Sequence, residues 1–337
     1  MKSAVRQSEI GELVRSGLSR KAKALPPWLF YDTAGTELFE RITQLDAYYL
    51  TRKERQILLQ HSGAIVDVCV PGTQWQVFEL GAGSARKTAH LLRAALERQR
   101  IVEYHPLDIS LDAMLNAVEY LAQELPEVKV CPEVTDYTQS QPRPLASDAG
   151  GCKALLWMGS SLGNYEQAEA VAVLRRASAH FRTGDILLLG VDLHPSEGSK
   201  QKQDLIVAYD DPEGVTAAFN RNLLLRLNRE LGADFRPDQF AHRADWNEAS
   251  GRMEMHLVSR IFQQVHVAEL EQTFVFQAGE SIHTESSYKL TVQQVQELLQ
   301  QAGFPFVSVW MDPQRWFGVF LGRRSSPAAA DLSSTQR

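Results

Sequence analysis

Short apolar runs alternate with segments of helical period between residues 75 and 195. The apolar runs cover residues 77–80, 102–110, 128–134, 154–160 and 186–192. Amphipathic stretches follow several of them, with apolar residues three and four positions apart. Buried parallel strands read as near-continuous apolar runs, and an alternation of strand and helix is typical of a doubly wound sheet. We therefore predict a Rossmann-like α/β fold for this region.

The alternation ends after residue 195. Residues 196–288 predict a long helix over 215–231, followed by antiparallel strands within 252–265, 267–276 and 280–288. The α/β pattern then returns with a helix over 291–302, which Gly303 ends, and with closing strands at 306–311 and 317–321. Residues 196–288 are therefore predicted to be an insertion into the α/β region.

The N-terminal segment differs from both regions. It begins polar and weakly helical, with Ile10, Leu13, Val14 and Leu18 spaced for one helical face. After Pro26-Pro27, Thr36 is placed to cap a helix that follows a glycine turn, and a further helix is predicted from about Thr51 to His61. The aromatic side chains in this segment either form a small core or line a pocket for a cationic or aromatic ligand.

Composition limits the partners. The 337 residues include 35 basic and 41 acidic side chains, a net charge of −6, so no basic excess points to nucleic acid or to an anionic membrane. We find neither the apolar segment of a signal peptide nor a run of 18 apolar residues. Cys69, Cys131 and Cys152 form no C-x-x-C pair, and we interpret them as buried thiols in a reducing compartment. We predict a cytoplasmic monomer that binds no metal.

A turn with two glycines follows the first strand of the α/β region. Glu79 precedes it, and Gly81 and Gly83 let a ligand lie against bare backbone. The dinucleotide fingerprint G-x-G-x-x-G is broken because Arg86 stands at its third glycine, and the G-K-[ST] of a phosphate-binding loop is absent. An acidic residue beside such a turn suits a ligand with a cationic end, such as S-adenosylmethionine. A turn that only packs strand on helix is the alternative.

Further acidic and polar residues follow the other strands. Asp108 is placed to accept the ribose hydroxyls of a nucleoside, or else to cap the next helix in competition with Ser110. Asp136, followed by Tyr137, is placed to contact an adenine ring, although turn aspartates are common. Asn164 lies in a polar cluster after the fourth strand. Taken one at a time, none of these positions identifies a function.

Taken together, the motifs resemble those of the histidine Nα-methyltransferases of ergothioneine biosynthesis, which belong to the class I S-adenosylmethionine-dependent methyltransferases. The resemblance covers roughly residues 30 to 321. Its marks are Tyr31-Asp32-x-x-Gly35-x-x-Leu38-Phe39, Tyr48-Tyr49-x-Thr51-Arg52-x-Glu54, Glu79-Leu80-Gly81-x-Gly83, Gly159-Ser160-x-x-Gly163-Asn164, Ala208-Tyr209-Asp210-Asp211, Gly214-Val215-Thr216-x-x-Phe219-Asn220-x-Asn222, Asn228-Arg229-Glu230-Leu231 and Thr284-Glu285-x-Ser287.

The resemblance implies a methyltransferase that uses S-adenosylmethionine to trimethylate the α-amine of L-histidine to hercynine. It implies an α/β domain of residues 56–195 and 289–323, a substrate-binding α+β domain of residues 1–55 and 196–288, and a disordered tail over 324–337. The implied catalytic residues are Asn164, Tyr209 and Tyr31. The implied substrate contacts are Tyr48, Phe39, Asn164, Tyr209, Met255, Glu285 and Ser287. The implied cofactor contacts are Glu79, Gly81, Gly83, Lys87, Asp108, Asp136, Tyr137 and Gly159.

The chain departs from the usual family pattern at a few positions near the expected pocket. These are Asp46, Ala47, Leu50, Tyr165 and His256. A relative that methylates the α-amine of another amino acid, such as tryptophan or tyrosine, would look similar outside the imidazole contacts, and we keep it as the alternative function. The missing third glycine disfavours a nicotinamide oxidoreductase. A nucleoside-binding regulator without activity would not need the polar set at Asn164, Tyr209 and Glu285.

Overall fold

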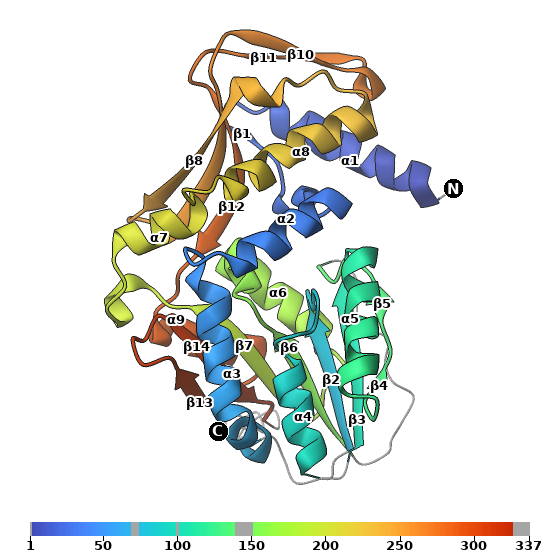
Figure 1. Ribbon diagram of the computed structural model, residues 1–337, viewed down its shortest axis with the longest axis vertical. Helices are drawn as coiled ribbons and strands as arrows, with labels where there is room; N and C mark the ends of the chain where they lie inside the picture. The colour runs from blue at the N-terminus through green and yellow to red at the C-terminus, as the bar shows by residue number, and fades with distance from the viewer. Residues whose placement is uncertain (1, 69–73, 99–100, 139–150, 326–337) are drawn as a thin grey trace, which may run out of the picture. The chain divides into compact units, whose positions relative to one another are not determined.

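The computed structural model describes residues 2–68, 74–98, 101–138 and 151–325 (Figure 1). The chain forms two compact units. The insertion unit contains Met1–Arg52 and Ser199–Lys289, and the sheet unit contains Lys53–Gly198 and Leu290–Arg337. The boundaries expected from the sequence, after residues 55, 195 and 288, each lie within three residues of these. The expected tail falls outside the described residues from position 326 onward.

A mixed sheet with the order β13-β14-β7-β6-β2-β3-β4 forms the centre of the sheet unit, and β5 pairs with β3 beside β4. β14 runs antiparallel to both β13 and β7, whereas the other pairs among the described strands of this sheet are parallel. β13 and β14 form the antiparallel closing hairpin that the sequence predicts. The strands are β2 (Gln74–Leu80), β3 (Ile101–Asp108), β4 (Lys129–Val130), β5 (Glu133–Val134), β6 (Cys152–Trp157), β7 (Ile186–Asp192), β13 (Phe306–Met311) and β14 (Phe317–Arg323).

Helices follow the strands of this sheet, as the alternating pattern predicts. They are α3 (Tyr49–Val68, which begins in the insertion unit), α4 (Ala89–Glu97), α5 (Leu111–Glu124), α6 (Gln167–Ala177) and α9 (Val292–Ala302). The side chains of α6 and α9 pack on β6, β7 and β14 in one apolar core. All seven residues of β7 are buried, which explains its unbroken apolar sequence.

Two predicted strands are shorter than the apolar runs suggest. The run over 128–134 is split into β4 and β5 around Cys131-Pro132, because proline has no N–H for the ladder. The run over 154–160 ends as a strand at Trp157. Gly159 and Ser160 have φ values of 75° and 60°, in the left-handed region, so an extended strand cannot continue there.

The insertion unit is built around a four-stranded sheet with the order β1-β12-β9-β8. Its strands are β1 (Lys23–Ala24), β8 (Phe240–Asn247), β9 (Arg252–Ser259) and β12 (Ser281–Tyr288), with a separate hairpin of β10 (Gln263–Val267) and β11 (Gln272–Phe276). Its helices are α1 (Lys2–Leu18), α2 (Thr33–Gln44), α7 (Lys202–Tyr209) and α8 (Val215–Leu231). The sequence pattern did not disclose α7, β1 or β8.

The N-terminal predictions need two corrections. Leu13 does not share the buried face of α1, because it is 42% exposed whereas Ile10, Val14 and Leu18 are buried. Thr36 does not cap α2. Asp32 does, since its carboxylate accepts a hydrogen bond from the Gly35 N–H at 2.7 Å. Among the described residues, no helix is long and apolar enough to cross a membrane.

Candidate active site

The turn after β2 lies at the point where the connections of the sheet change direction. β2 leads to β3 on one side, while its other neighbour, β6, leads to β7 on the opposite side. In an open α/β sheet, ligands bind beyond the carboxyl ends of the strands at such a point. Gly81 and Gly83 have φ values of 66° and 55°, and a Cβ added at Gly83 would meet nothing within 4 Å. This turn therefore offers bare backbone and open space.

Glu79 supports this turn from inside the protein. Its carboxylate accepts hydrogen bonds from the Thr88 hydroxyl at 2.8 Å and from the Tyr104 hydroxyl at 2.5 Å. Burial raises the pKa of Glu79 to about 7, against the lowering effect of both hydrogen bonds. Both oxygens have protein donors, so Glu79 connects β2 to β3 and to the start of α4.

A second carboxylate, Glu54 of α3, joins the ends of β2 and β6. Glu54 is fully buried, pairs with the ammonium of Lys87, and accepts the Gly159 N–H at 2.7 Å. Gly190 on β7 makes room for it, because a Cβ there would lie 2.0 Å from the Glu54 carboxylate. The structure thus brings together Lys87 and Gly159, two predicted cofactor residues, through a glutamate that was not predicted to lie in the site.

The next predicted cofactor residues lie at the ends of β3 and β5. Asp108 accepts the Gly83 N–H at 3.0 Å and the Ser110 N–H at 2.9 Å, while Ser110 caps α5. The alternative interpretation of Asp108 as that cap is therefore wrong. Burial raises the pKa of the Asp108 carboxyl. The Asp136 carboxylate accepts the backbone N–H and the hydroxyl of Thr138 at 2.9 and 2.5 Å, which is the local bonding of a turn aspartate.

Aromatic side chains surround the residue after Asp136. The Tyr137 hydroxyl would lie 3.3 Å from a Cβ on Gly81, and the ring of Tyr137 meets Trp157 edge-on at 6.0 Å. Tyr165, one of the departures from the family pattern, packs on Trp157 at 5.5 Å, and burial raises its pKa to about 12. Asn164 ends the short 3-10 helix η2 (Ser161–Asn164) beside Tyr165 and is half-buried.

A buried polar group connects α7 with the end of β12 in the insertion unit. The Tyr209 hydroxyl donates to the Ser287 hydroxyl oxygen at 2.8 Å. The Lys289 ammonium donates to both oxygens, at 2.8 Å to Tyr209 and 2.9 Å to Ser287, and lies 4.7 Å from the centre of the Tyr209 ring. Because the Ser287 oxygen accepts two hydrogen bonds, its own proton can be donated to a ligand.

Glu285 lies two residues before Ser287 on the same strand and is 9% exposed. A register shift between His283 and Glu285 interrupts the pairing of β12 with β9, so Thr284 and Glu285 are both buried although they are neighbours. Within the described part of the chain, no hydrogen bond reaches the Glu285 carboxylate. Burial raises its pKa to about 7, and the positive charge of Lys289 acts in the opposite direction. An acceptor of this kind is costly to bury unless a ligand supplies a donor.

The remaining predicted substrate residues line up around this group. Aromatic rings form a chain from Tyr31 to Phe39 (5.6 Å between centroids), Phe39 to Tyr48 (6.3 Å) and Tyr48 to Tyr209 (6.4 Å). Met255 is buried and pairs with Glu285 across the sheet. His256, a departure from the family pattern, follows Met255 on β9 and so faces the other side of the sheet. The chain therefore provides an aromatic wall beside one carboxylate and two hydroxyls.

Sequence reasoning missed Glu54 and Lys289 as parts of these sites. Glu54 stood in the Tyr48–Glu54 motif, so position alone could have suggested it. Lys289 gave no signal, since a lysine directly after a strand reads as a solvated residue. Only the fold shows that Lys289 is 2% exposed and bonded to Tyr209 and Ser287.

The sheet order and the glycine turn at its switch point define a class I S-adenosylmethionine-dependent methyltransferase. Residues 10–324 match the family described as "Histidine-specific methyltransferase, SAM-dependent", and the chain belongs to that family. It is 38% identical to the "Histidine N-alpha-methyltransferase" of Mycobacterium tuberculosis, over 92% of this chain and 94% of that one, and equally similar to that of Mycolicibacterium smegmatis. It is 28% identical to "Ergothioneine biosynthesis protein 1" of Schizosaccharomyces pombe, over 93% of this chain and 40% of that one.

Proposed function

We propose that this enzyme transfers three methyl groups in turn from S-adenosylmethionine to the α-amine of L-histidine. The product is hercynine, and the reaction is the first step of ergothioneine biosynthesis. The family and the names of its relatives support the reaction. The observation that carries the choice of substrate is Glu285, a buried carboxylate with no hydrogen-bond donor among the described residues, two positions before a hydroxyl that can donate.

An imidazole ring matches this pair. A neutral imidazole has one nitrogen that donates and one that accepts. The N–H would be accepted by Glu285, and the bare nitrogen would accept the Ser287 hydroxyl proton. The indole of tryptophan has a donor but no acceptor, and the phenol of tyrosine carries both functions on one oxygen, so neither offers a donor and an acceptor at two separate ring positions. Sites built around such hydrogen bonds reject the wrong side chain strongly.

The other groups of histidine would be held by neutral side chains. We propose that Asn164 and Tyr209 bind the α-amino and α-carboxylate groups, with Tyr48 contacting the same ligand and Tyr31, Phe39 and Met255 shaping its pocket. A neutral environment favours the uncharged amine, the form that attacks a methyl group. Lys289 is a positioning residue, because it orients the hydroxyls of Tyr209 and Ser287.

The cofactor would lie at the glycine turn of the sheet unit. Gly81, Gly83 and Gly159 offer backbone, Asp108 would accept ribose hydroxyls, and Asp136 and Tyr137 would contact the adenine. Glu79 and Lys87 already have the protein partners described above, so we propose that they shape this site. S-adenosylmethionine supplies an electrophilic methyl on its sulfonium. Transfer is an in-line displacement, so what the protein contributes is mainly orientation.

The experiment is to incubate the full-length protein with S-adenosylmethionine and each of the twenty amino acids and to weigh the products. We expect histidine alone to gain three methyl groups. Methylation of another amino acid in place of histidine would leave the enzyme class intact and refute the roles of Glu285 and Ser287. A cytoplasmic monomer without a nucleic-acid or membrane partner also stays a prediction, as does methyl transfer that needs no metal cofactor, and sedimentation of the purified chain tests its oligomeric state.

A further inference from the structure

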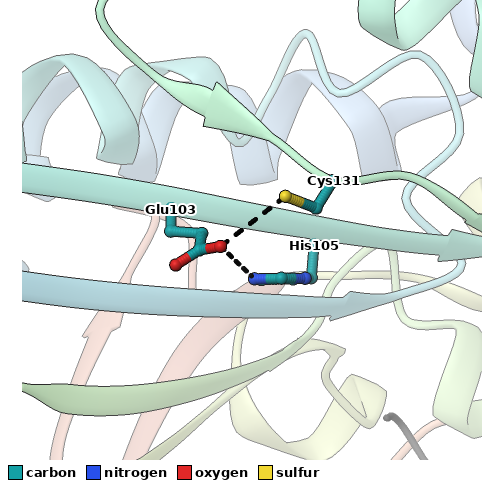
Figure 2. A group of neighbouring side chains, drawn as sticks. All are labelled: Glu103, His105 and Cys131. Atoms are coloured by element: carbon teal, nitrogen blue, oxygen red, sulfur yellow. Dashed lines mark hydrogen bonds and ion pairs between the residues drawn. The ribbon is translucent and has the colours of Figure 1, made fainter. Parts of the chain in front are cut away.

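Three potential metal ligands meet at the edge of the sheet formed by β3 and the segment after β4. Glu103 and His105 are two residues apart on β3 and so point to the same side. Cys131 follows β4, the parallel neighbour of β3. Figure 2 shows the three side chains converging, and their donor atoms all lie within 4.8 Å of one another. The proposed catalytic residues do not include any of them.

Two distances within this cluster match those between neighbouring ligands of one ion. The Glu103 carboxylate oxygen Oε1 lies 3.6 Å from His105 Nε2 and 3.6 Å from Cys131 Sγ (Figure 2). Around a tetrahedral zinc ion with bond lengths of about 2.0–2.3 Å, neighbouring ligand atoms are roughly 3.4–3.6 Å apart. Carboxylate, imidazole and thiolate are the three ligand types that zinc takes in proteins.

A second observation also points to a ligand. His105 Nε2 is buried and has no hydrogen-bond partner within the described residues. The ring is held in place by Phe78, which stacks on it with centroids 4.8 Å apart and planes 18° from parallel. A buried, unpaired nitrogen aimed at a carboxylate and a thiol is what a metal would satisfy.

We propose that Glu103, His105 and Cys131 bind one Zn²⁺ ion, with water in the fourth position. Binding releases the proton of the Cys131 thiol to solvent and forms the zinc–sulfur bond without any redox change. The sequence-based interpretation of the cysteines as buried thiols considered only cysteine spacing, and Cys131 is in fact half-buried. Cysteine spacing does not show that Cys131 faces a histidine and a glutamate from the neighbouring strand.

Lys129 competes with the metal in this site. Its ammonium donates to Glu103 Oε1 at 2.7 Å, the same oxygen that faces the histidine and the cysteine. Its side chain is 70% exposed, so it can move into solvent when a metal arrives. Removing Lys129 should therefore strengthen zinc binding, whereas removing a ligand should weaken it. The two kinds of variant should therefore change the zinc affinity in opposite directions, which adventitious binding at the surface would not do.

The test is a zinc titration of the full-length, untagged chain against a chromophoric chelator, with proton release recorded in parallel. We expect one equivalent of zinc and about one proton from the thiol. Cys131→Ser and His105→Gln should each lower the affinity at least about tenfold, the smallest loss typical even of an outer partner. Lys129→Met should raise it, and Cys152→Ser, a buried thiol outside the cluster, should leave it unchanged. Wild-type chain that takes up no zinc, or Cys131→Ser that binds as tightly as wild type, refutes the site.

A measurement on the unmodified chain guards against variants that fail to fold. Zinc should slow alkylation of the Cys131 thiol, which peptide masses report at that residue, and should raise the melting temperature because it binds only the folded state. Co²⁺ should give a thiolate-to-metal absorption band. Alkylation of Cys131 at the same rate with and without zinc would overturn the proposal. These readouts do not depend on methyltransferase activity, so they stand or fall apart from the proposed function.

Discussion

Glu79 in the sheet unit and Glu285 in the insertion unit are buried carboxyl groups, and burial raises the pKa of each to about 7. Their surroundings differ. Glu79 accepts hydrogen bonds from Thr88 and Tyr104, whereas Glu285 receives none from the described residues. A shifted pKa alone therefore does not separate a structural acid from a binding one. The hydrogen bonds around each carboxylate separate the two roles. Those of Glu79 support a turn, whereas the carboxylate of Glu285 is left available to a ligand.

The sharpest test of this contrast is Glu285→Ala. We expect kcat/KM for histidine to fall by roughly a thousandfold or more, because the imidazole N–H would lose its acceptor inside a closed site. The affinity for S-adenosylmethionine, measured by calorimetry, should not change. Ser286→Ala on the same strand is the control and should have little effect. Loss of cofactor binding in the Glu285 variant would show that this residue, too, is structural.

Glu79→Ala should produce the opposite pattern. Removal of the carboxylate leaves the buried hydroxyls of Thr88 and Tyr104 without an acceptor, so the free energy of unfolding should drop by about 2–4 kcal/mol. Urea unfolding measures this loss. Glu79→Gln keeps one acceptor and should lose less. If Glu79→Ala retained full stability and lost only cofactor affinity, the turn-supporting role would be wrong.

The pH dependence of stability distinguishes a buried carboxyl group such as Glu285 from an ordinary surface acid. The folded protein holds a proton on Glu285 up to about pH 7, whereas an exposed glutamate in the unfolded chain loses it near 4.3. The folded state therefore binds more protons in this window, and the free energy of unfolding falls as pH rises through it. For Glu285 the fall between pH 5 and pH 7 is about 2 kcal/mol. Urea unfolding of Glu285→Gln across that range should lack this component; equal slopes in both proteins would contradict the burial argument.

The smallest expected effect comes from Lys289→Met. The positive charge of Lys289 partly offsets the rise that burial causes in the pKa of Glu285. Its removal should therefore raise that pKa further and move the acidic limb of the kcat/KM profile to higher pH. Loss of its hydrogen bonds to Tyr209 and Ser287 should lower kcat/KM about tenfold. Lys202→Met, an exposed lysine of the same unit, is the control. An unchanged pH profile would mean that Lys289 only fills space.

Much of the sheet unit follows from the sequence, because buried parallel strands and amphipathic helices have distinct periods. β7 has the predicted bounds, as does the helix α8 in the insertion unit. Local patterns failed where a backbone constraint or a distant partner decided the outcome. Pro132 divided a continuous apolar run, and β8 pairs with β9, a partner that its own sequence does not reveal.

The candidate site also combines features that the sequence predicts with features that it does not. Its residues could be proposed from motifs, since spacing survives in the chain. The hydrogen bonds that assign their roles could not, because several join distant positions, such as Glu54 with Lys87 and Gly159, which lie 33 and 105 residues further along the chain. The register shift that turns Glu285 inward has no signature in a single strand. The sequence alone can therefore identify such residues, but it does not show which carboxylate already accepts hydrogen bonds from other protein groups.

The burial of Lys289 gives the insertion unit an internal reporter of its own opening. Amine-reactive reagents need a solvent-accessible amine that can lose its proton, and the Lys289 amine is 2% exposed and bonded to two hydroxyls. Lys202 should be modified at once, whereas Lys289 should be modified only when α7 separates from β12. The labelling rate of Lys289 relative to that of Lys202 then measures how often α7 separates from β12. Bound histidine should lower this ratio, and the measurement does not require methyl transfer.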